Sequence, residues 1–443
     1  MLDFVVTMAV RTYPLLAAFL LSAGLAPPQT PLIRHDLTES GPETVGFSSQ
    51  RLDRLHSTLR KMIDDRVVPG MVTMLARHGK IVDVHTYGTR ELGGTAPMAR
   101  DAIFRIHSMT KPLTGVAMMI LYEQGKWLPS DPIAKFIPEF ANLRVYKGDA
   151  NGDVQTEAPK HRPTMAELMS HTAGFTYGSF GDTPVDRMYR KVEPFVSSNL
   201  HEMIVKLAGL PLLYQPGEEW VYSASVDIQG YIVEKISGKP LGAFIRENIL
   251  DPLGMRDTGF HVDPAKMNRF VPVYKMTLQG SLAEVPPDAM SRDYVKEPGM
   301  PSGGGGMVST ASDYLRFAQM LLEGGQLDGV RILAPASVAM MRANRLPDAI
   351  RNSDQYGISF FRVRPGAGFG FDFAVYDEPF LVSHPVGKGT YFWFGAGGTW
   401  FWIDPTNDIV FVGMVQRMLE ATSPDLNFIS QALVYQALVN PEK

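Results

Sequence analysis

The sequence predicts an α/β fold in which two separated pieces of chain form a sheet domain around an inserted, mostly helical domain. β-rich apolar segments occur between residues 72 and 87 and again from residue 356 onward. The chain between them consists of helical patterns and polar, Gly/Pro-bearing stretches. Strands at both ends with helices between them indicate one sheet that draws on both ends of the chain. We place the discontinuous α/β domain at 43–105 and 305–443 and the helical domain at 106–304, and we expect any functional site to lie between the two.

The first elements after the N-terminal segment support this order. Residues 48–65 predict an amphipathic helix, because apolar side chains recur at helical spacing. Residues 72–76 and 81–87 predict two strands joined by the turn at 77–80. A strong helix follows from Ser108 to Gln124, and its apolar segment 113–122 marks it as buried and central. Pro112 is tolerated only in a first helical turn, which places Ser108 at the helix N-terminus.

The remaining elements follow from the same periodicity rules. Helices are predicted at 164–171, 201–207, 226–237, 241–249, 312–324 and 426–439. Strands are predicted at 356–363, 390–394, 400–403 and 409–415. Polar, Gly/Pro-bearing stretches at 147–162, 176–194 and 275–301 predict loops. Loops as long as 176–194 are often functional, and we expect this one to border the opening through which a ligand would reach Ser108.

Composition narrows the class of protein. The chain has 443 residues, of which 45% are hydrophobic and 20% charged, as is typical of globular proteins. The net charge is −4 and no block of like charge stands out, so no nucleic-acid partner is predicted. There are no cysteines, which excludes disulfides, thiolate catalysis and zinc–thiolate sites.

The N-terminus resembles a secretory signal peptide. Arg11 precedes an apolar run at 13–26, and small residues follow its centre. We therefore predict a signal peptide at 1–26 and export to the periplasm or the medium; without cleavage the segment is an N-terminal helix of a cytoplasmic protein. The apolar run is shorter than the roughly 20 residues of a spanning helix, so no stable membrane span is predicted.

The predicted central helix begins with Ser108-Met109-Thr110-Lys111, a Ser-x-x-Lys pattern that can provide a nucleophile. Residues three apart share a helix face, so the Lys111 amine can reach the Ser108 hydroxyl and take its proton. The helix N-terminus adds backbone N–H groups and a positive field that favour an oxyanion. About one Ser-x-x-Lys match arises by chance in a chain of this length, and the position before a wholly apolar helix makes this one more specific.

Two further patterns later in the chain could contribute to the same chemistry as Ser108 and Lys111. Tyr222-Ser223-Ala224 offers a tyrosine hydroxyl that can shuttle a proton beside a lysine, although an isolated tyrosine is more often a core aromatic. Trp393-Phe394-Gly395-Ala396 ends a late strand whose edge can give an N–H to an oxyanion, and the alternative is a plain Gly-rich turn.

The three patterns in this order resemble the family VIII carboxylesterases, in the superfamily of class C β-lactamases, DD-peptidases and transesterases. Supporting stretches are Leu168 to Phe175, Pro216-Gly217, Gly303 to Thr310 and Ile403-Asp404-Pro405. The similarity runs from about Gly46 to Val439. It implies a β-lactamase-like, DD-peptidase fold: an antiparallel sheet flanked by helices, plus a mostly helical inserted domain.

The resemblance also implies roles for individual residues. Ser108 corresponds to the nucleophile, Lys111 to its base partner, and Tyr222 to the tyrosine that protonates the leaving group. The backbone N–H groups of Ser108 and Ala396 correspond to the oxyanion hole. The residues assigned to substrate binding are Trp393, Phe394, Gly395, Phe175 and Tyr177.

Two departures from the β-lactamase pattern favour neutral substrates. Trp393 stands where β-lactamases carry the lysine that attracts a substrate carboxylate, and Ala224 replaces an amide-binding Asn. We therefore expect an acyl-serine esterase that acts on small neutral carboxylic esters, with β-lactams as poorer substrates. The alternatives are a β-lactamase or DD-peptidase, an acyltransferase that uses the same residues, and a non-catalytic penicillin-binding-like sensor.

Several known functional motifs do not occur in the sequence, and four other polar residues are expected to have structural roles. No Gly-x-Ser-x-Gly elbow, metal-binding His-Glu-x-x-His or dinucleotide fingerprint occurs, so neither a metal nor a cofactor is predicted. His107 is expected to pack, and His171 to order its loop. Asp227 and Gln229 are expected to support the helix that follows Tyr222.

Overall fold

A computed structural model describes residues 37–150, 153–286, 294–353, 357–358, 361–421 and 423–441. The predicted signal peptide at 1–26 lies outside these residues. In the part of the chain that is described, no helix is both long and apolar enough to cross a membrane.

The described strands include both predicted ends of the sheet. They are β1 (Gly70–Arg77), β2 (Lys80–Gly88), β3 (Phe104–Arg105), β4 (Val145–Ala150), β5 (Asp153–Glu157), β6 (Tyr274–Met276), β7 (Leu282–Glu284), β8 (Val308–Ser309), β9 (Gln326–Leu327), β10 (Val330–Arg331), β11 (Gly357–Ile358), β12 (Phe361–Arg362), β13 (Gly368–Phe369), β14 (Ala374–Tyr376), β15 (Thr390–Phe394), β16 (Trp400–Asp404) and β17 (Ile409–Val415).

The described helices begin and end as follows. They are α1 (Ser49–Asp64), α2 (Thr110–Glu123), α3 (Met165–Met169), α4 (Pro184–Val192), α5 (Leu200–Ala208), α6 (Ser225–Ser237), α7 (Leu241–Ile245), α8 (Asp251–Leu253), α9 (Ala311–Leu322), α10 (Pro335–Met341), α11 (Asp348–Arg351) and α12 (Leu426–Tyr435). A short 3₁₀ turn, η2 (His107–Met109), leads directly into α2.

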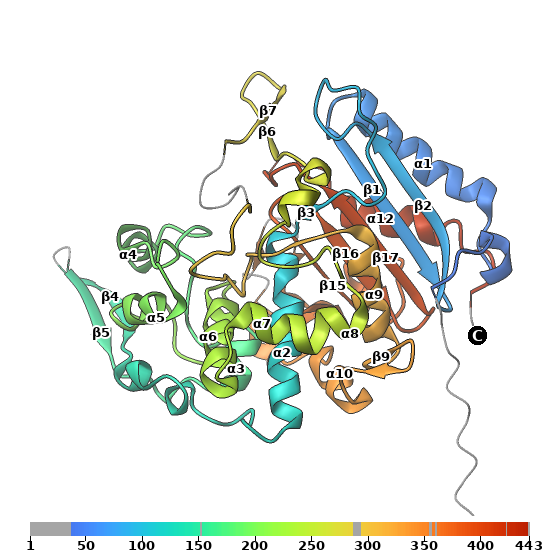
Figure 1. Cartoon of the computed structure of the whole chain (residues 1–443). Coiled ribbons are helices and arrows are strands. Elements are labelled where there is room, and N and C mark those ends of the chain that lie inside the picture. The colour runs from blue at the N-terminus through green and yellow to red at the C-terminus, as the bar shows by residue number, and fades with distance from the viewer. Residues whose placement is uncertain are drawn as a thin grey trace, which may run out of the picture. The chain divides into compact units, whose positions relative to one another are not determined.

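Strands from the two ends of the chain form one antiparallel sheet. Among the described residues its order is β13-β14-β15-β16-β17-β1-β2, so the N-terminal hairpin pairs with the last strand through β1 and β17 (Figure 1). Every residue of β1 and β17 is buried, because both strands lie inside the sheet with helices over them. The expected antiparallel sheet flanked by helices is therefore confirmed, while the domain boundaries at 105/106 and 304/305 remain a prediction.

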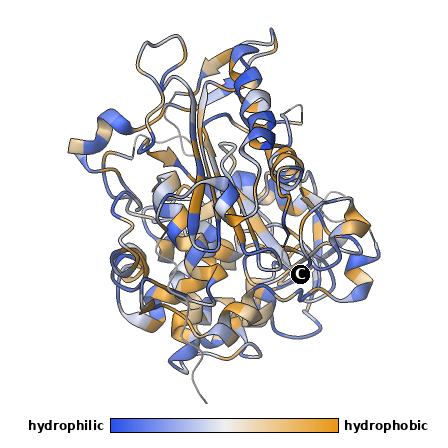
Figure 2. Cartoon of the chain, turned by 90° about the vertical axis from the view of Figure 1, so that its right-hand side faces the viewer, coloured by the Kyte–Doolittle hydropathy of each residue, from blue (hydrophilic) through white to orange (hydrophobic). Residues whose placement is uncertain are grey.

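Helices cover both faces of this sheet, as the alternation along β16 shows. The indole N–H groups of Trp400 and Trp402 both donate to Ser430 Oγ on α12, at 3.1 Å. The intervening Phe401 faces the other way and packs on Tyr314 of α9, with ring centroids 5.0 Å apart. The helices carry both hydrophobic and hydrophilic residues (Figure 2), as expected of elements that bury one side only.

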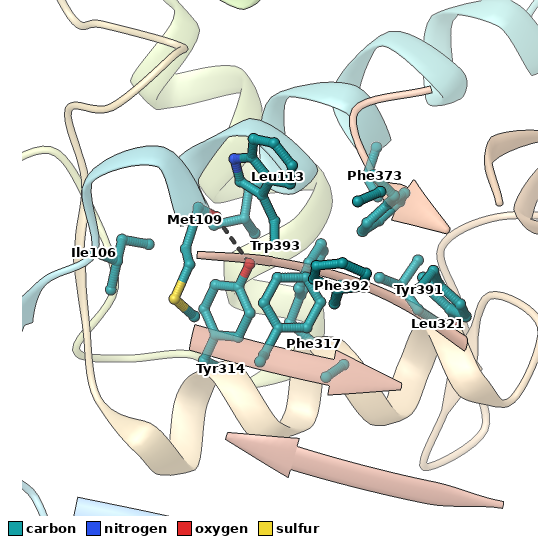
Figure 3. Packing of buried hydrophobic residues seen from close by; sticks show 14 of the residues in the cluster. Ile106, Met109, Leu113, Tyr314, Phe317, Leu321, Phe373, Tyr391, Phe392 and Trp393 are labelled. Atoms are coloured by element: carbon teal, nitrogen blue, oxygen red, sulfur yellow. Dashed lines mark hydrogen bonds between the residues drawn. The ribbon is translucent and has the colours of Figure 1, made fainter. Parts of the chain in front are cut away.

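The central helix α2 is buried along most of its length, as predicted. Apolar side chains from α2, α9 and β15 pack together around its first turn, and Met109 and Leu113 lie in this cluster (Figure 3). The Tyr314 hydroxyl of α9 donates to the Met109 carbonyl oxygen at 2.8 Å. This hydrogen bond fixes the turn that carries Ser108.

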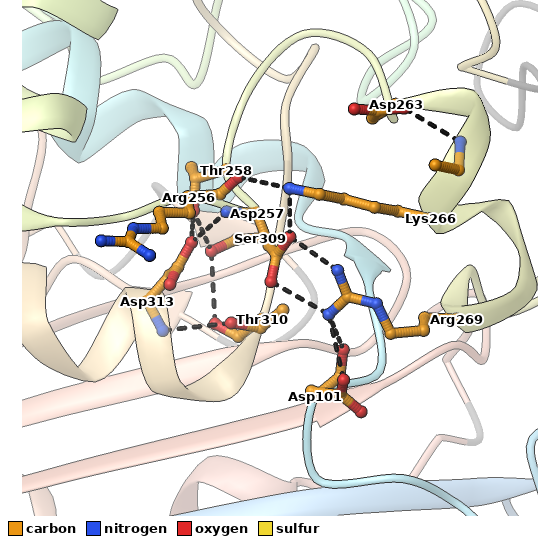
Figure 4. A network of polar contacts seen from close by, with 11 residues as sticks. Asp101, Arg256, Asp257, Thr258, Asp263, Lys266, Arg269, Ser309, Thr310 and Asp313 are labelled. Atoms are coloured by element: carbon orange, nitrogen blue, oxygen red, sulfur yellow. Dashed lines mark hydrogen bonds and ion pairs between the residues drawn. The ribbon is translucent and has the colours of Figure 1, made fainter.

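A polar network secures the segment between α8 and β6 (Figure 4). Asp257 forms ion pairs with Lys266 and Arg269, each at 2.7 Å, and Arg269 also pairs with Asp101 at 3.2 Å. Asp313 in the first turn of α9 accepts from the Thr258 hydroxyl at 2.9 Å. The network therefore ties this segment to α9 and to the chain just before β3.

All three stretches predicted as loops contain some regular structure, and the one at 275–301 contains most of the β6–β7 hairpin. The loop at 176–194 contains α4, which begins with a capping box between Thr183 and Asp186 and has Pro184 in its first turn. The stretch at 147–162 contains most of the β4–β5 hairpin, whose polar side chains give no apolar alternation. The predicted strand at 356–363 is a short hairpin, β11–β12, and residues 356, 359 and 360 lie outside the described ones.

Asp372, between β13 and β14, is a buried acid for which the structure predicts a pH-dependent stability cost. Its side chain is fully buried, accepts from Gln229 Nε2 at 3.0 Å, and lies against Gly115 of α2. Burial raises the pKa of Asp372 well above its ordinary value, and neither the Gln229 hydrogen bond nor the charge of Lys111 offsets it.

We expect Asp372→Asn to raise the free energy of unfolding above that of the wild type, and to do so more at pH 8 than at pH 4. The folded state holds this proton more tightly than the unfolded state. The wild type therefore loses stability as the pH rises above the ordinary Asp pKa, and an amide does not. The gain, measured by urea unfolding, should grow by at least about 1.4 kcal/mol between the two values, the equivalent of one pKa unit. The exposed change Asp64→Asn is the control, and an equal effect at both pH values would contradict the prediction.

Candidate active site

Ser108 lies in η2, where neighbouring elements hold the backbone on both sides. Ile106 N donates to Met307 O at 3.0 Å, and the Met109 carbonyl accepts from α9 as described. His107 is buried and has a left-handed backbone with φ of 42°. Such strained conformations in non-glycine residues cluster at functional sites, where the surrounding structure maintains them. The Ser108 side chain itself is only partly buried and remains reachable.

The side chain of Lys111, the predicted base partner, lies beside the Ser108 hydroxyl. This side chain is 1% exposed, and Nζ donates to Ser108 Oγ at 3.3 Å. Nζ also donates to the Tyr177 hydroxyl at 3.0 Å and to the Gly304 carbonyl at 2.7 Å. These three partners surround Nζ, so in the neutral amine two N–H groups bind the Tyr177 and Gly304 oxygens while the lone pair faces the Ser108 hydroxyl and can accept its proton. The amine is thus aimed at Ser108 by two fixed oxygens from distant parts of the chain.

Tyr222 lies beside the same amine. Lys111 Nζ is 4.5 Å from the centre of the Tyr222 ring, and Trp393 Nε1 donates to the Tyr222 hydroxyl at 3.3 Å. A donor at this oxygen interacts more strongly as negative charge develops there, which suits a proton shuttle. The three residues predicted as catalytic therefore occupy one place in the structure.

His171 holds the segment that carries Tyr222, as expected. Val221 N donates to the His171 carbonyl oxygen at 2.9 Å, and Ser223 N donates to Nδ1 at 3.2 Å. Burial, with a smaller contribution from the charge of Lys111, holds the pKa of His171 well below its ordinary value. The ring is therefore neutral, and its role is structural.

The end of β15 lies against the turn that carries Ser108. A Cβ placed on Gly395 would come 2.4 Å from the Ile106 carbonyl oxygen, so only glycine permits this approach. Neither Ser108 N–H nor Ala396 N–H donates to any other residue that the structure describes. Both groups are therefore available to an oxyanion, and their role in an oxyanion hole remains a prediction.

The residues predicted to bind substrate differ in their accessibility. Phe394 is partly exposed. Trp393 has no exposed surface, and Phe175 is 1% exposed and packs on Phe140. In this conformation Trp393 acts on the site through Tyr222, and Tyr177 acts through Lys111. Phe180 was not predicted: it is 60% exposed and its ring centroid is 5.3 Å from that of Tyr222.

Asp227 is a site residue that sequence reasoning assigned only to helix support. Its carboxylate accepts from the Tyr177 hydroxyl at 3.0 Å, from Ser302 Oγ at 2.5 Å and from Gly304 N at 3.1 Å. Burial, followed by the charge of Asp227, raises the pKa of Tyr177 well above its ordinary value, so that residue remains a neutral phenol. Asp227 therefore positions both oxygens that aim the Lys111 amine.

We expect Asp227→Asn to lower kcat about 10- to 100-fold while changing KM less than about threefold. Hydrogen bonds to a charged group are worth about 1.5–3 kcal/mol, and their loss here misplaces Lys111 without touching substrate. Ester hydrolysis and thermal unfolding of the same preparation measure the effect. Asp404→Asn is the matched control, because this buried acid at the end of β16 accepts from Gly387, Thr406 and Asn407 and from no residue of the site. Equal losses of kcat in both variants would assign Asp227 a merely structural role.

Known proteins resemble this chain over most of its length, in sequence and in fold. The β-lactamase family model matches residues 55–436. An uncharacterised Mycobacterium tuberculosis protein is 37% identical over 388 residues, which cover 86% of this chain and 93% of the relative. Esterase EstB of Burkholderia gladioli is 29% identical over 404 residues, 86% of this chain and 94% of EstB.

Solved structures agree with the fold. EstCE1, described as a hydrolase with promiscuous acyltransferase activity, matches with a TM-score of 0.73 at 27% identity, over 87% of this chain and 99% of its own. Unliganded simvastatin synthase from Aspergillus terreus matches with a TM-score of 0.75 at 23% identity, over 88% and 98% of the two chains. The predicted β-lactamase-like fold is confirmed. The chain belongs to the β-lactamase family of serine hydrolases, and its similarity to EstB and EstCE1 groups it with the family VIII esterases.

Proposed function

We propose that this protein is a serine carboxylesterase that hydrolyses small neutral carboxylic esters through an acyl-Ser108 intermediate. The observation that carries the proposal is the 3.3 Å contact between Lys111 Nζ and Ser108 Oγ, beside Tyr222. A serine hydroxyl becomes a nucleophile when a positioned base accepts its proton. The esterase relatives support the same class of chemistry.

The proposed reaction has two halves. Ser108 Oγ attacks the ester carbonyl while its proton passes to the Lys111–Tyr222 pair. The backbone N–H groups of Ser108 and Ala396 bind the oxyanion of the tetrahedral intermediate. The Tyr222 hydroxyl then protonates the departing alkoxide, and the alcohol leaves an acyl-serine ester. Water, activated by the same pair, attacks this ester, releases the acid and returns the proton to Ser108.

The surroundings of the nucleophile favour neutral substrates. Aromatic rings gather at Tyr222: the centroid of the Tyr177 ring is 5.5 Å away, that of Phe180 5.3 Å and that of Trp393 5.3 Å. No cation stands at the position where β-lactamases carry their carboxylate-binding lysine, because Trp393 occupies it. A desolvated carboxylate without a partner costs several kcal/mol, so anionic β-lactams should bind poorly.

A comparison of substrate classes on one preparation tests the proposal. We expect kcat/KM for p-nitrophenyl butyrate to exceed that for nitrocefin and penicillins by at least about 100-fold at pH 7–8, which is the effect of about 2.7 kcal/mol. Equal or faster turnover of β-lactams would favour a β-lactamase or DD-peptidase instead. Covalent labelling of Ser108 without turnover of either class would favour a sensor.

Acyl transfer is the second candidate, because several relatives carry that activity in their names or descriptions. EstCE1 is described as having promiscuous acyltransferase activity, and an acyltransferase, mokF of Monascus pilosus, is 27% identical over 325 residues. The same acyl-Ser108 would then be attacked by an acceptor alcohol in place of water. Addition of 1-butanol to the p-nitrophenyl ester assay should yield a butyl ester if transfer competes with hydrolysis, and acid alone if it does not.

A further inference from the structure

A second cluster of chemically active side chains lies between α1 and the edge strand β2. Asp83 and His85 alternate along β2 and so point to the same side of the sheet. His56 lies on α1, in the same stretch as its buried Leu52, Leu55 and Leu59, and its ring stacks on that of His85. The ring centroids are 3.8 Å apart, with an angle of 22° between the planes. A helix and a strand thus bring two imidazoles and a carboxylate together.

The ligand atoms are close enough to share one ion once one imidazole turns out of the stack, because imidazole lone pairs lie in the ring planes. His56 Nε2 is 2.9 Å from Asp83 Oδ1, and His85 Nδ1 is 3.7 Å from the same oxygen. One ligand atom from each of the three residues lies within 4.8 Å of the others.

The second carboxylate oxygen of Asp83 adds an independent observation. The Asp83 side chain is only 10% exposed, and its Oδ2 is buried without a hydrogen-bond partner among the described residues. A buried polar atom left without a partner typically costs about 1–3 kcal/mol, so such atoms usually have a ligand or a water. Oδ2 thus has an unmet requirement for a partner, and a cation bound by the Asp83 carboxylate would meet it.

We propose that His56, Asp83 and His85 bind a divalent transition-metal ion, with Zn²⁺ the best match. Two imidazole nitrogens and one carboxylate oxygen form a ligand set that Zn²⁺ accepts, and water completes the coordination. Asp53 Oδ1 lies 3.8 Å from His56 Nδ1, the ring nitrogen that does not face Asp83. This distance is too long for a hydrogen bond, so the Asp53 carboxylate would act on a bound cation only through its charge.

The site is separate from the proposed catalytic one. β2 lies four strands along the sheet from β15, which corresponds to about 19 Å at the usual strand spacing. A metal ion there links α1 to the edge strand and therefore stabilises the folded state without entering the reaction at Ser108. We accordingly expect Zn²⁺ to raise the thermal midpoint and leave ester turnover unchanged.

Titration of the untagged, chelator-treated full chain with ZnCl₂ in a calorimeter tests this inference. The expected result is one Zn²⁺ per chain with micromolar or tighter affinity. His85→Ala and Asp83→Asn should each weaken binding at least tenfold, the usual scale for loss of a ligand or its support. Co²⁺ should bind in competition with Zn²⁺ and give visible absorption bands that disappear in His85→Ala. His201→Ala is the matched control, because His201 lies 3.7 Å from a single carboxylate, that of Glu139.

Two results would overturn the inference. One is no binding of Zn²⁺ or Co²⁺ to the wild type up to about 1 mM. The other is binding that survives unchanged in the folded variants. His56→Gln serves if an alanine variant fails to fold, because a glutamine amide retains a hydrogen-bond donor for Asp83 while removing the imidazole. Zn²⁺ should raise the thermal midpoint of the wild type and of His201→Ala, and leave that of His56→Gln unchanged.

Discussion

Replacement of Ser108 by alanine should abolish ester hydrolysis, with a loss in kcat of about 10⁴-fold or more. The side chain that would form the acyl-enzyme disappears, and neither Lys111 nor Tyr222 can replace a covalent nucleophile. The fold should survive, because Ser108 is partly exposed and its backbone is held by contacts from Met307 and Tyr314. Release of p-nitrophenolate from p-nitrophenyl butyrate measures the loss, and an unchanged thermal midpoint shows that folding is intact.

Intact-protein mass spectrometry separates the role of Ser108 from that of its neighbours. Wild-type protein quenched during turnover should carry one acyl group, and Ser108→Ala should carry none. Ser57→Ala, on α1, is the control and should behave as the wild type. Turnover in Ser108→Ala near the wild-type rate would show that another residue is the nucleophile.

The parts of the fold with strong periodicity could be predicted from sequence. β15 and β17 occupy the predicted residues, and β16 exceeds its prediction by only Asp404, because these strands are apolar, β-rich and bounded by clear turns. The buried helix α2 was predictable for a similar reason: its apolar residues cover nearly every face. The pairing of the N-terminal hairpin with β17 follows only from the chain order of strands, helices and strands.

The rest depended on long-range contacts that no local pattern contains. Asp227 is one polar residue on an otherwise ordinary helix, and its importance comes from the Tyr177 hydroxyl and Gly304, distant in sequence. His56 likewise looks like any polar residue on an amphipathic helix until β2 packs beside it. By contrast, α4 had a readable local signal, because Thr183, Pro184 and Asp186 form a helix start.

Substitution of Trp393 by lysine should unfold or severely destabilise the protein, by about 3–5 kcal/mol or more. In β-lactamases a lysine at this position attracts a substrate carboxylate, but in this protein the side chain at this position is fully buried. Its indole packs on Phe361 and Phe369 at centroid distances of 5.8 and 5.3 Å, and it donates to Tyr222. Loss of a buried tryptophan costs about 3–5 kcal/mol, and an ammonium group buried among aromatic rings adds to that cost.

Trp393→Phe separates packing from chemistry at the same position. Phenylalanine retains most of the aromatic contact with Phe361 and Phe369 but has no N–H to donate to Tyr222. Trp393→Phe should therefore stay folded with a modest loss of stability, while kcat falls about tenfold, the effect of one net hydrogen bond of about 1.4 kcal/mol. Urea unfolding and ester kinetics on both variants measure the two effects. A stable Trp393→Lys protein that gains penicillin hydrolysis would show that this side chain turns toward the substrate. In that case the charge at this position, rather than its burial, determines which substrates the enzyme accepts.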